Sequence, residues 1–311
     1  MTAKNAILDI LPPFAQQNRA RHSAAGEFHM QPDTDTILFA IAVTAFAGLS
    51  TGIGSAIAYF AKRTNFRFLS FALGFSGGVM LYVSFTEILT KADASLALLY
   101  GQPTAGWITT GAFFLGIIIM MVIDRLVPDA ENPHELTPKT QIASYQAHET
   151  AGTFSGDTVR DQRLMRMGLF SALAIAIHNF PEGLATFLAA IENPELGIAI
   201  GLAIAIHNIP EGIAVSVPIF YATGSRSKAF GHSFLSGLSE PVGGLVGFFL
   251  LSTFATPEAF GITFGAVAGI MVYISLDELL PTAREYATGH EVLYGIVCGM
   301  AVMAVSLLLV R

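Results

Sequence analysis

Long apolar stretches, separated by short polar segments, make up most of the chain after residue 35. A helix needs about 20 mostly apolar residues to cross the hydrocarbon core of a bilayer. The predicted spans are Thr36–Ala61, Phe68–Leu89, Gly101–Ile123, Met167–Ile191, Leu196–Ser225, Ala229–Pro257, Ala259–Leu280 and Val292–Val310. Because these runs are apolar on every side, they predict helices and not the alternating strands of a membrane β-barrel. The pattern therefore predicts an all-α, polytopic membrane protein with eight transmembrane helices.

The composition of the 311 residues supports the same class. Hydrophobic residues make up 53% of the chain and charged residues 13%, whereas soluble domains carry about 25% charged residues. A single cysteine, Cys298, excludes a disulfide scaffold. The net charge of −7 argues against a nucleic-acid partner, which would require a basic surface. The lipid bilayer is therefore the expected environment.

Lys and Arg are distributed unevenly over the connections between the predicted helices. Of the 16 Lys and Arg residues, 11 lie in every second connection along the chain. These connections are on the inner side of the membrane if the N-terminus lies outside. Cytoplasmic loops of membrane proteins carry this excess of positive charge. We therefore expect the N-terminus outside and, because the number of spans is even, the C-terminus outside as well.

Two segments lack the pattern of a membrane helix. Residues 1–35 contain no apolar run long enough for a signal peptide and are expected to form a flexible outer tail. Whether Met1 or Met30 is the natural start is left open. Residues 128–161 are polar and have no helical period, which predicts a disordered cytoplasmic loop between the third and fourth spans. The eight-span domain then covers residues 36–311.

One motif occurs twice, in the fourth and fifth predicted spans. Residues 173–185 read LAIAIHNFPEGLA and residues 202–214 read LAIAIHNIPEGIA, with 11 of 13 positions identical. The two helices run in opposite directions, and both copies lie near the middle of their spans. This arrangement predicts an inverted repeat around a site at the membrane midplane.

Each copy of the motif presents the same polar side chains on one helix face. His178 and Glu182 are four residues apart, so they lie one turn apart on that face. An ionised glutamate at the centre of a membrane helix costs roughly 2.5–3.5 kcal/mol, and no Lys or Arg lies at the same depth. The carboxylates are therefore either protonated or bound to a cation, and the neighbouring imidazoles and amides favour a divalent ion such as Zn²⁺, Fe²⁺, Mn²⁺ or Co²⁺. The candidate ligands are His178, Asn179, Glu182, His207, Asn208, Glu211 and Glu240.

Two other chemistries use similar residues. A bis-histidine haem would leave the nearby carboxylates without a role. A di-metal enzyme would carry Glu-x-x-His or His-Glu-x-x-His spacing within its helices, and the chain has neither there. An integral-membrane di-metal enzyme that uses the same His and Glu ligands is kept as the alternative function.

These motifs resemble those of the ZIP (Zrt/Irt-like) divalent metal transporters, and most of all their bacterial ZupT-type branch. The similar segments are HNFPEG at 178–183, HNIPEG at 207–212, GFSGGVML at 74–81, SGLSEPVGG at 236–244, AGIMVYISLDELLP at 268–281 and YGIVCGMAVM at 294–303. The resemblance covers roughly residues 36–311 and implies a ZIP-like fold. It also implies uptake of zinc, iron, manganese, cobalt or cadmium into the cytoplasm across a bacterial inner membrane, with no cofactor and no catalytic residues.

The resemblance also assigns roles to individual residues. His178, Glu182, His207 and Glu211 would hold one ion, and Asn179, Asn208 and Glu240 would hold a neighbouring ion with the two motif glutamates as bridges. Met80 would line the pathway. A bundle of the first, fourth, fifth and sixth helices would slide against the others. The sequence leaves open which metal is physiological, whether one or two ions bind at once, the coupling ion and whether the chain forms a homodimer.

Four acidic residues lie near the ends of predicted spans. By the predicted topology, Glu87 is near the outer end of the second span, where it would help to collect the cation. Asp124 ends the third span, and Asp277 and Glu278 end the seventh, all on the inner side, where they would form a release site. Solvated interfacial acids are the alternative interpretation.

Overall fold

The structure is a computed structural model that describes residues 33–60, 65–126, 158–254 and 256–310. Every regular element in these ranges is a helix. The elements are α3 (Thr34–Phe60), α4 (Phe66–Val83), η1 (Ser84–Ile88), α5 (Leu89–Tyr100), α6 (Thr104–Leu126), α8 (Thr158–Glu192), α9 (Pro194–Thr223), α10 (Arg226–Gly237), α11 (Ser239–Phe254), α12 (Pro257–Ile274), η3 (Ser275–Leu279), α13 (Leu280–Tyr286) and α14 (Glu291–Val310). The two elements η1 and η3 are short π-helices within longer helices.

Helices occupy all of the predicted spans, but not all of them meet the requirements for a membrane helix. Within the described ranges, six helices are long and apolar enough to cross a bilayer: α3, α4 with α5, α6, α9, α12 with α13, and α14. The all-helical membrane fold is thereby confirmed. The count of eight spans stays a prediction, because α8 and the α10–α11 pair are not among the six.

Some element boundaries differ from the predicted ones. The predicted span Ala229–Pro257 is broken at Leu238, a turn that separates α10 from α11. Pro241 has no N–H to donate to the carbonyl four residues earlier, so the helix loses a bond at this point. In addition, α8 begins at Thr158 and so includes the last four residues of the predicted loop. The rest of that loop and nearly all of the predicted tail lie outside the described residues.

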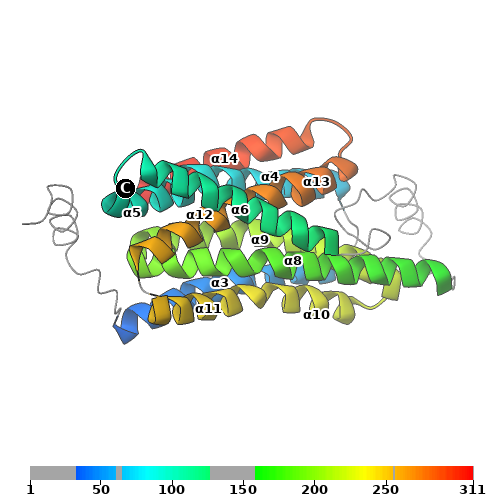
Figure 1. The fold of residues 1–311 in the computed structure, drawn as a ribbon. Helices are drawn as coiled ribbons and strands as arrows, with labels where there is room; N and C mark the ends of the chain where they lie inside the picture. Colours follow the sequence, from blue (N-terminus) through cyan, green and yellow to red (C-terminus); the bar gives the residue numbers. More distant parts are fainter. Residues whose placement is uncertain (1–32, 61–64, 127–157, 255, 311) are drawn as a thin grey trace, which may run out of the picture.

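The helices form two bundles that lie side by side. One contains α3, α8, α9, α10 and α11, and the other contains α4 with α5, α6, α12 with α13, and α14 (Figure 1). The bundles meet mainly where α4 contacts α9 and where α8 contacts α12. These are the groups of helices that the family resemblance separates into a sliding bundle and its partner.

Glycines bring neighbouring helices of each bundle into close contact. A β-carbon at Gly54 of α3 would overlap the backbone of Ile209 on α9, and one at Gly78 of α4 would overlap the backbone of Ile296 on α14. Small residues at helix interfaces are typical of membrane bundles, because backbone approach increases van der Waals contact. The glycine pattern thus determines which faces of these helices pack together.

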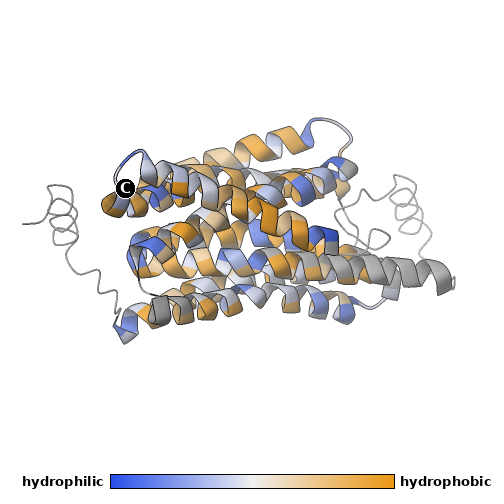
Figure 2. Ribbon diagram, viewed as in Figure 1, coloured by the Kyte–Doolittle hydropathy of each residue, from blue (hydrophilic) through white to orange (hydrophobic). Residues whose placement is uncertain are grey.

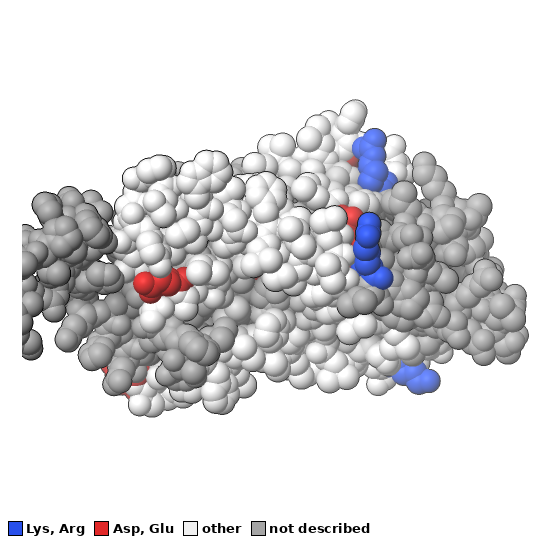
Figure 3. All heavy atoms as spheres, viewed as in Figure 1, with Lys and Arg blue, Asp and Glu red and all other residues white. Residues whose placement is uncertain are grey.

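Apolar residues predominate along the helices (Figure 2), and many large apolar side chains are exposed on the surface of the bundle. Trp107 on α6 is 77% exposed and Leu309 on α14 is 82% exposed. On the face drawn in Figure 3, the Lys and Arg side chains lie at one end of the bundle. Lys91 of α5 lies at the other end, where it pairs with Glu192. The first described helix, α3, begins at this second end, where α14 also finishes (Figure 1). This arrangement suits a protein surrounded by lipid, in which the first described helix begins and the last one ends on the same side.

Candidate metal site between the repeated helices

The two copies of the repeated motif lie on helices that form an antiparallel pair. Asn193 connects α8 to α9, and its side chain accepts hydrogen bonds from the backbone N–H groups of Glu195 and Leu196. Pro194 occupies the first turn of α9, where a missing N–H costs nothing. This tight connection places α8 and α9 in extensive contact. The copies of the motif therefore come from adjacent helices.

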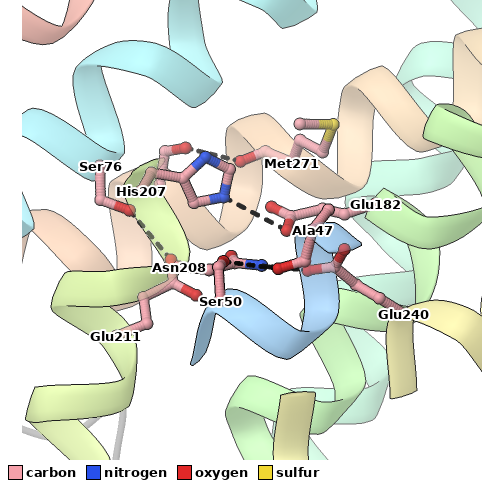
Figure 4. A network of polar contacts seen from close by, with 10 residues as sticks. Ala47, Ser50, Ser76, Glu182, His207, Asn208, Glu211, Glu240 and Met271 are labelled. Atoms are coloured by element: carbon pink, nitrogen blue, oxygen red, sulfur yellow. Dashed lines mark hydrogen bonds and ion pairs between the residues drawn. The ribbon is translucent and has the colours of Figure 1, made fainter. Parts of the chain in front are cut away.

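His207 and Glu182 bring the two copies into direct contact. Nε2 of His207 on α9 lies 3.3 Å from Oε2 of Glu182 on α8, and neither side chain has any solvent exposure (Figure 4). The side chain of His178, the equivalent histidine on α8, lies outside the described set. The contact between the copies is the arrangement that a shared site requires.

Asn208 and Glu240 form a second buried pair that includes helix α11. The Asn208 side-chain amide donates to Oε1 of Glu240, and it also donates to the backbone carbonyl of Ala47 on α3 at 3.0 Å (Figure 4). Helix α11 reaches this position because Gly183 of α8 lies against the backbone of Glu240. The motif glycine therefore allows Glu240 to approach the repeat, which the sequence alone did not reveal.

Glu211 is held from the other bundle. Oε1 of Glu211 accepts a hydrogen bond from Oγ of Ser76 on α4 at 2.9 Å, and both side chains are fully buried (Figure 4). Ser76 was not among the predicted site residues. It lies within GFSGGVML at 74–81, one of the segments that carry the resemblance, but nothing in its spacing connects it to the repeat.

Several polar atoms of the motif are buried without a partner among the described residues. They are both side-chain polar atoms of Asn179, Oε1 of Glu182 and Oδ1 of Asn208. A buried polar atom that makes no hydrogen bond costs about 1–3 kcal/mol. Carboxylate and amide oxygens in this position are suitable ligands for a divalent cation.

The described side chains do not form a complete set of ligands around one point. No group of three His, Cys, Asp or Glu side chains in the described ranges is placed to hold one ion. Glu182 contacts His207, Glu240 contacts Asn208, and Glu211 contacts Ser76. The structure thus holds Glu182, Glu211 and Glu240 in separate buried contacts, and the complete ligand set stays a prediction.

The residues predicted for the rest of the pathway lie on the second bundle. Met80 is fully buried on α4, and Glu87 is nearly buried in η1. Glu278 is nearly buried in η3, close to α13, whose end of the bundle is opposite to that of α5 (Figure 1). Asp124 on α6 accepts a hydrogen bond from the Tyr273 hydroxyl of α12 at 3.4 Å. Asp277 is partly buried in η3.

A second repeat, missed in the sequence analysis, connects two of these segments. Residues 78–89 read GVMLYVSFTEIL and residues 269–280 read GIMVYISLDELL, with six of 12 positions identical. Each segment passes from an α-helix into a five-residue π-helix that contains the glutamate, and the buried Met80 and Met271 are equivalent. Single-turn π-helices often mark functional sites. Comparing the chain with itself at lower identity would have found this repeat.

Comparisons with known proteins agree with the sequence motifs. The sequence model of the family described as "ZIP Zinc transporter" matches residues 34–307. Relatives named "Zinc transporter ZupT" include one from Chlorobium chlorochromatii that is 56% identical over 276 residues, or 89% of this chain and 99% of the relative. One from Nitratidesulfovibrio vulgaris is 56% identical over 278 residues, again 89% of this chain and 99% of the relative. One from Clostridium perfringens is 54% identical over 279 residues, or 88% and 97% of the two chains.

Proposed function

The chain belongs to the ZIP zinc transporter family, and on that premise we propose that zinc and related divalent ions cross the membrane at the buried site between α8, α9 and α11. The family consists of transporters rather than enzymes, so the di-metal enzyme alternative is not supported. The observation that carries the proposal is the buried contact between His207 and Glu182, because it joins the two copies of the motif.

The proposed ligands form two overlapping groups. His178, Glu182, His207 and Glu211 hold one ion. Asn179, Asn208 and Glu240 hold a second ion, with Glu182 and Glu211 as shared ligands. The buried acceptor atoms of Asn179, Glu182 and Asn208 that have no hydrogen-bond partner in the described part of the chain support this assignment, because an ion would satisfy them.

The proposed path runs through the second bundle. Met80 lines the pathway beside the site, Glu87 collects the cation at the outer end, and Asp124, Asp277 and Glu278 release it at the cytoplasmic end. The separation of the helices into two bundles supports transport by sliding, because all the proposed ligands of the central site lie on the bundle of α3, α8, α9 and α11.

The proposed orientation follows from the positive charges. Eight spans would place both termini in the periplasm and the Lys- and Arg-rich end in the cytoplasm of a bacterial cell, with uptake through the inner membrane. The Lys and Arg side chains at one end of the face in Figure 3 support this orientation.

Metal uptake by the purified full-length chain in liposomes tests the function. Radioactive Zn²⁺ should accumulate with saturation, and unlabelled Fe²⁺, Mn²⁺, Co²⁺ and Cd²⁺ should compete to different degrees. Glu182→Gln with Glu211→Gln should abolish uptake, while a Gly111→Ala control, whose β-carbon meets open space, should not change it. Uptake by the wild type that does not exceed that of empty liposomes would refute the proposed function.

A further inference from the structure

Ser76 connects the second bundle to a motif carboxylate of the first. Its hydroxyl donates to Oε1 of Glu211 at 2.9 Å, and both residues are fully buried. We propose that Ser76 is a positioning residue, which orients the Glu211 carboxylate so that its other oxygen faces the transported cation. This inference rests on the proposed function, because the assignment of Glu211 as a metal ligand is part of that proposal.

Helix geometry explains why Ser76 faces the site. Gly74 and Gly78 lie against the backbones of Val292 and Ile296, so their face of α4 packs on α14. Ser76 is two residues from each glycine, and two residues correspond to a rotation of about 200° around a helix. Its side chain therefore leaves the opposite face of α4, toward α9, where the hydrogen bond to Glu211 forms.

The hydrogen bond from Ser76 to Glu211 differs in origin from the contacts of the other two glutamates of the site. Glu182 contacts His207 and Glu240 contacts Asn208, and in each case both residues belong to the bundle of α3, α8, α9 and α11. The hydrogen bond from Ser76 to Glu211 comes instead from α4, across the boundary between the bundles. Through this bond, the orientation of the ligand depends in part on the position of the other bundle.

The chemistry of the bond suits a positioning role. A carboxylate has two oxygens with about four acceptor sites, so one oxygen can accept from a hydroxyl while the other binds a cation. A hydrogen bond to an ionised carboxylate is stronger than one between neutral groups. Fixing the flexible Glu211 side chain before the ion arrives lowers the entropy cost of binding. Removal of the hydroxyl should therefore weaken metal binding.

Three variants in liposomes test this role. Ser76→Ala removes the donor and should raise the KM of Zn²⁺ uptake about ten-fold, with Vmax changed less than two-fold. Ser76→Thr keeps the hydroxyl and should restore KM to within about three-fold of the wild-type value. The matched control is Ser70→Ala, which removes a buried hydroxyl of α4 that has no hydrogen-bond partner in the described ranges, and it should leave KM unchanged.

The outcomes separate this inference from the proposed function. A KM for Ser76→Ala within two-fold of wild type, or an equal rise in Ser70→Ala, would overturn the positioning role. If the Ser76→Thr protein fails to insert into the membrane, the positioning role is tested by comparing the Zn²⁺ affinities of purified Ser76→Ala and Ser70→Ala. In a Glu211→Gln background, Ser76→Ala should cause no further loss of Zn²⁺ affinity, because the pair acts as a unit. Normal Zn²⁺ binding and uptake by Glu211→Gln itself would refute the proposed site instead.

Discussion

Nε2 of His207 lies 3.3 Å from Oε2 of Glu182, and this contact joins α9 to α8 at the repeated motif. Both side chains are fully buried, so water does not compete for either group. A cation that binds both of them must lie between the two copies of the motif. This geometry leads to the first prediction, which concerns the histidines.

His178→Ala and His207→Ala should each weaken Zn²⁺ transport by about ten-fold or more, and the double variant should lose less than the two losses combined. Ligands of one ion act as a unit, so their removal is not additive. The measurement is kcat/KM for Zn²⁺ uptake at matched expression. Full additivity of the two losses in free energy would indicate two independent sites.

Gly183→Ala should reduce transport strongly, by about ten-fold or more, even though the change adds one methyl group. A β-carbon at this position would overlap the backbone carbonyl oxygen of Glu240, so α8 and α11 must separate and Glu240 must move. Gly111→Ala is the matched control, since its β-carbon meets nothing within 4 Å. Uptake by Gly183→Ala equal to that of the control would show that the close helix contact is dispensable.

Glu87→Gln and Glu278→Gln should affect opposite ends of the transport cycle. The two glutamates occupy equivalent positions in η1 and η3, which lie toward different ends of the bundle. A negative charge at the outer opening raises the local cation concentration, so Glu87→Gln should raise KM about three-fold or more. Glu278→Gln should instead lower Vmax. Uptake kinetics in vesicles of uniform orientation test this, and identical effects of both changes would contradict it.

Apparent Zn²⁺ affinity should fall steadily as the pH decreases from about 8 to about 5.5. Protonated imidazole and carboxylic acid groups cannot bind a metal, so protons compete with the ion for the same atoms. Free imidazole gains its proton within this range. Glu240→Gln should flatten the dependence because it removes one titrating ligand. Zn²⁺ binding to purified protein across the pH range measures both effects, and a wild-type affinity independent of pH would exclude these residues as the ligands.

Deletion of residues 1–33 should leave Zn²⁺ uptake within about two-fold of wild type. The segment carries no predicted span, repeat or cluster of ligands, and the first described helix begins at Thr34. Truncation near a chain end is often tolerated when the removed segment carries no such element. Uptake should be compared at equal amounts of membrane-inserted protein. Loss of transport by normally inserted protein would assign a function to the tail.

The linear order of residues was enough to predict the class of the protein and the residue types of its site. Continuous apolar runs give membrane helices because a buried backbone must satisfy its own hydrogen bonds. The near-identical motifs HNFPEG and HNIPEG identified the candidate ligands. Burying charged side chains in a membrane costs free energy, and a bound cation would offset that cost. Both inferences depend on local properties, which a linear pattern records.

The contacts of each predicted ligand, in contrast, follow from packing between segments far apart in the chain. Ser76 and Glu211 are 135 residues apart in the chain, and Asn208 reaches both Glu240 of α11 and the backbone of Ala47 on α3. The break at Leu238 and the π-helices around Glu87 and Glu278 are likewise absent from the hydropathy pattern. A membrane helix is apolar both where it faces lipid and where it faces another helix. The hydropathy pattern therefore does not specify which helices pack together. That choice comes from the close packing of glycines such as Gly183 against a distant backbone.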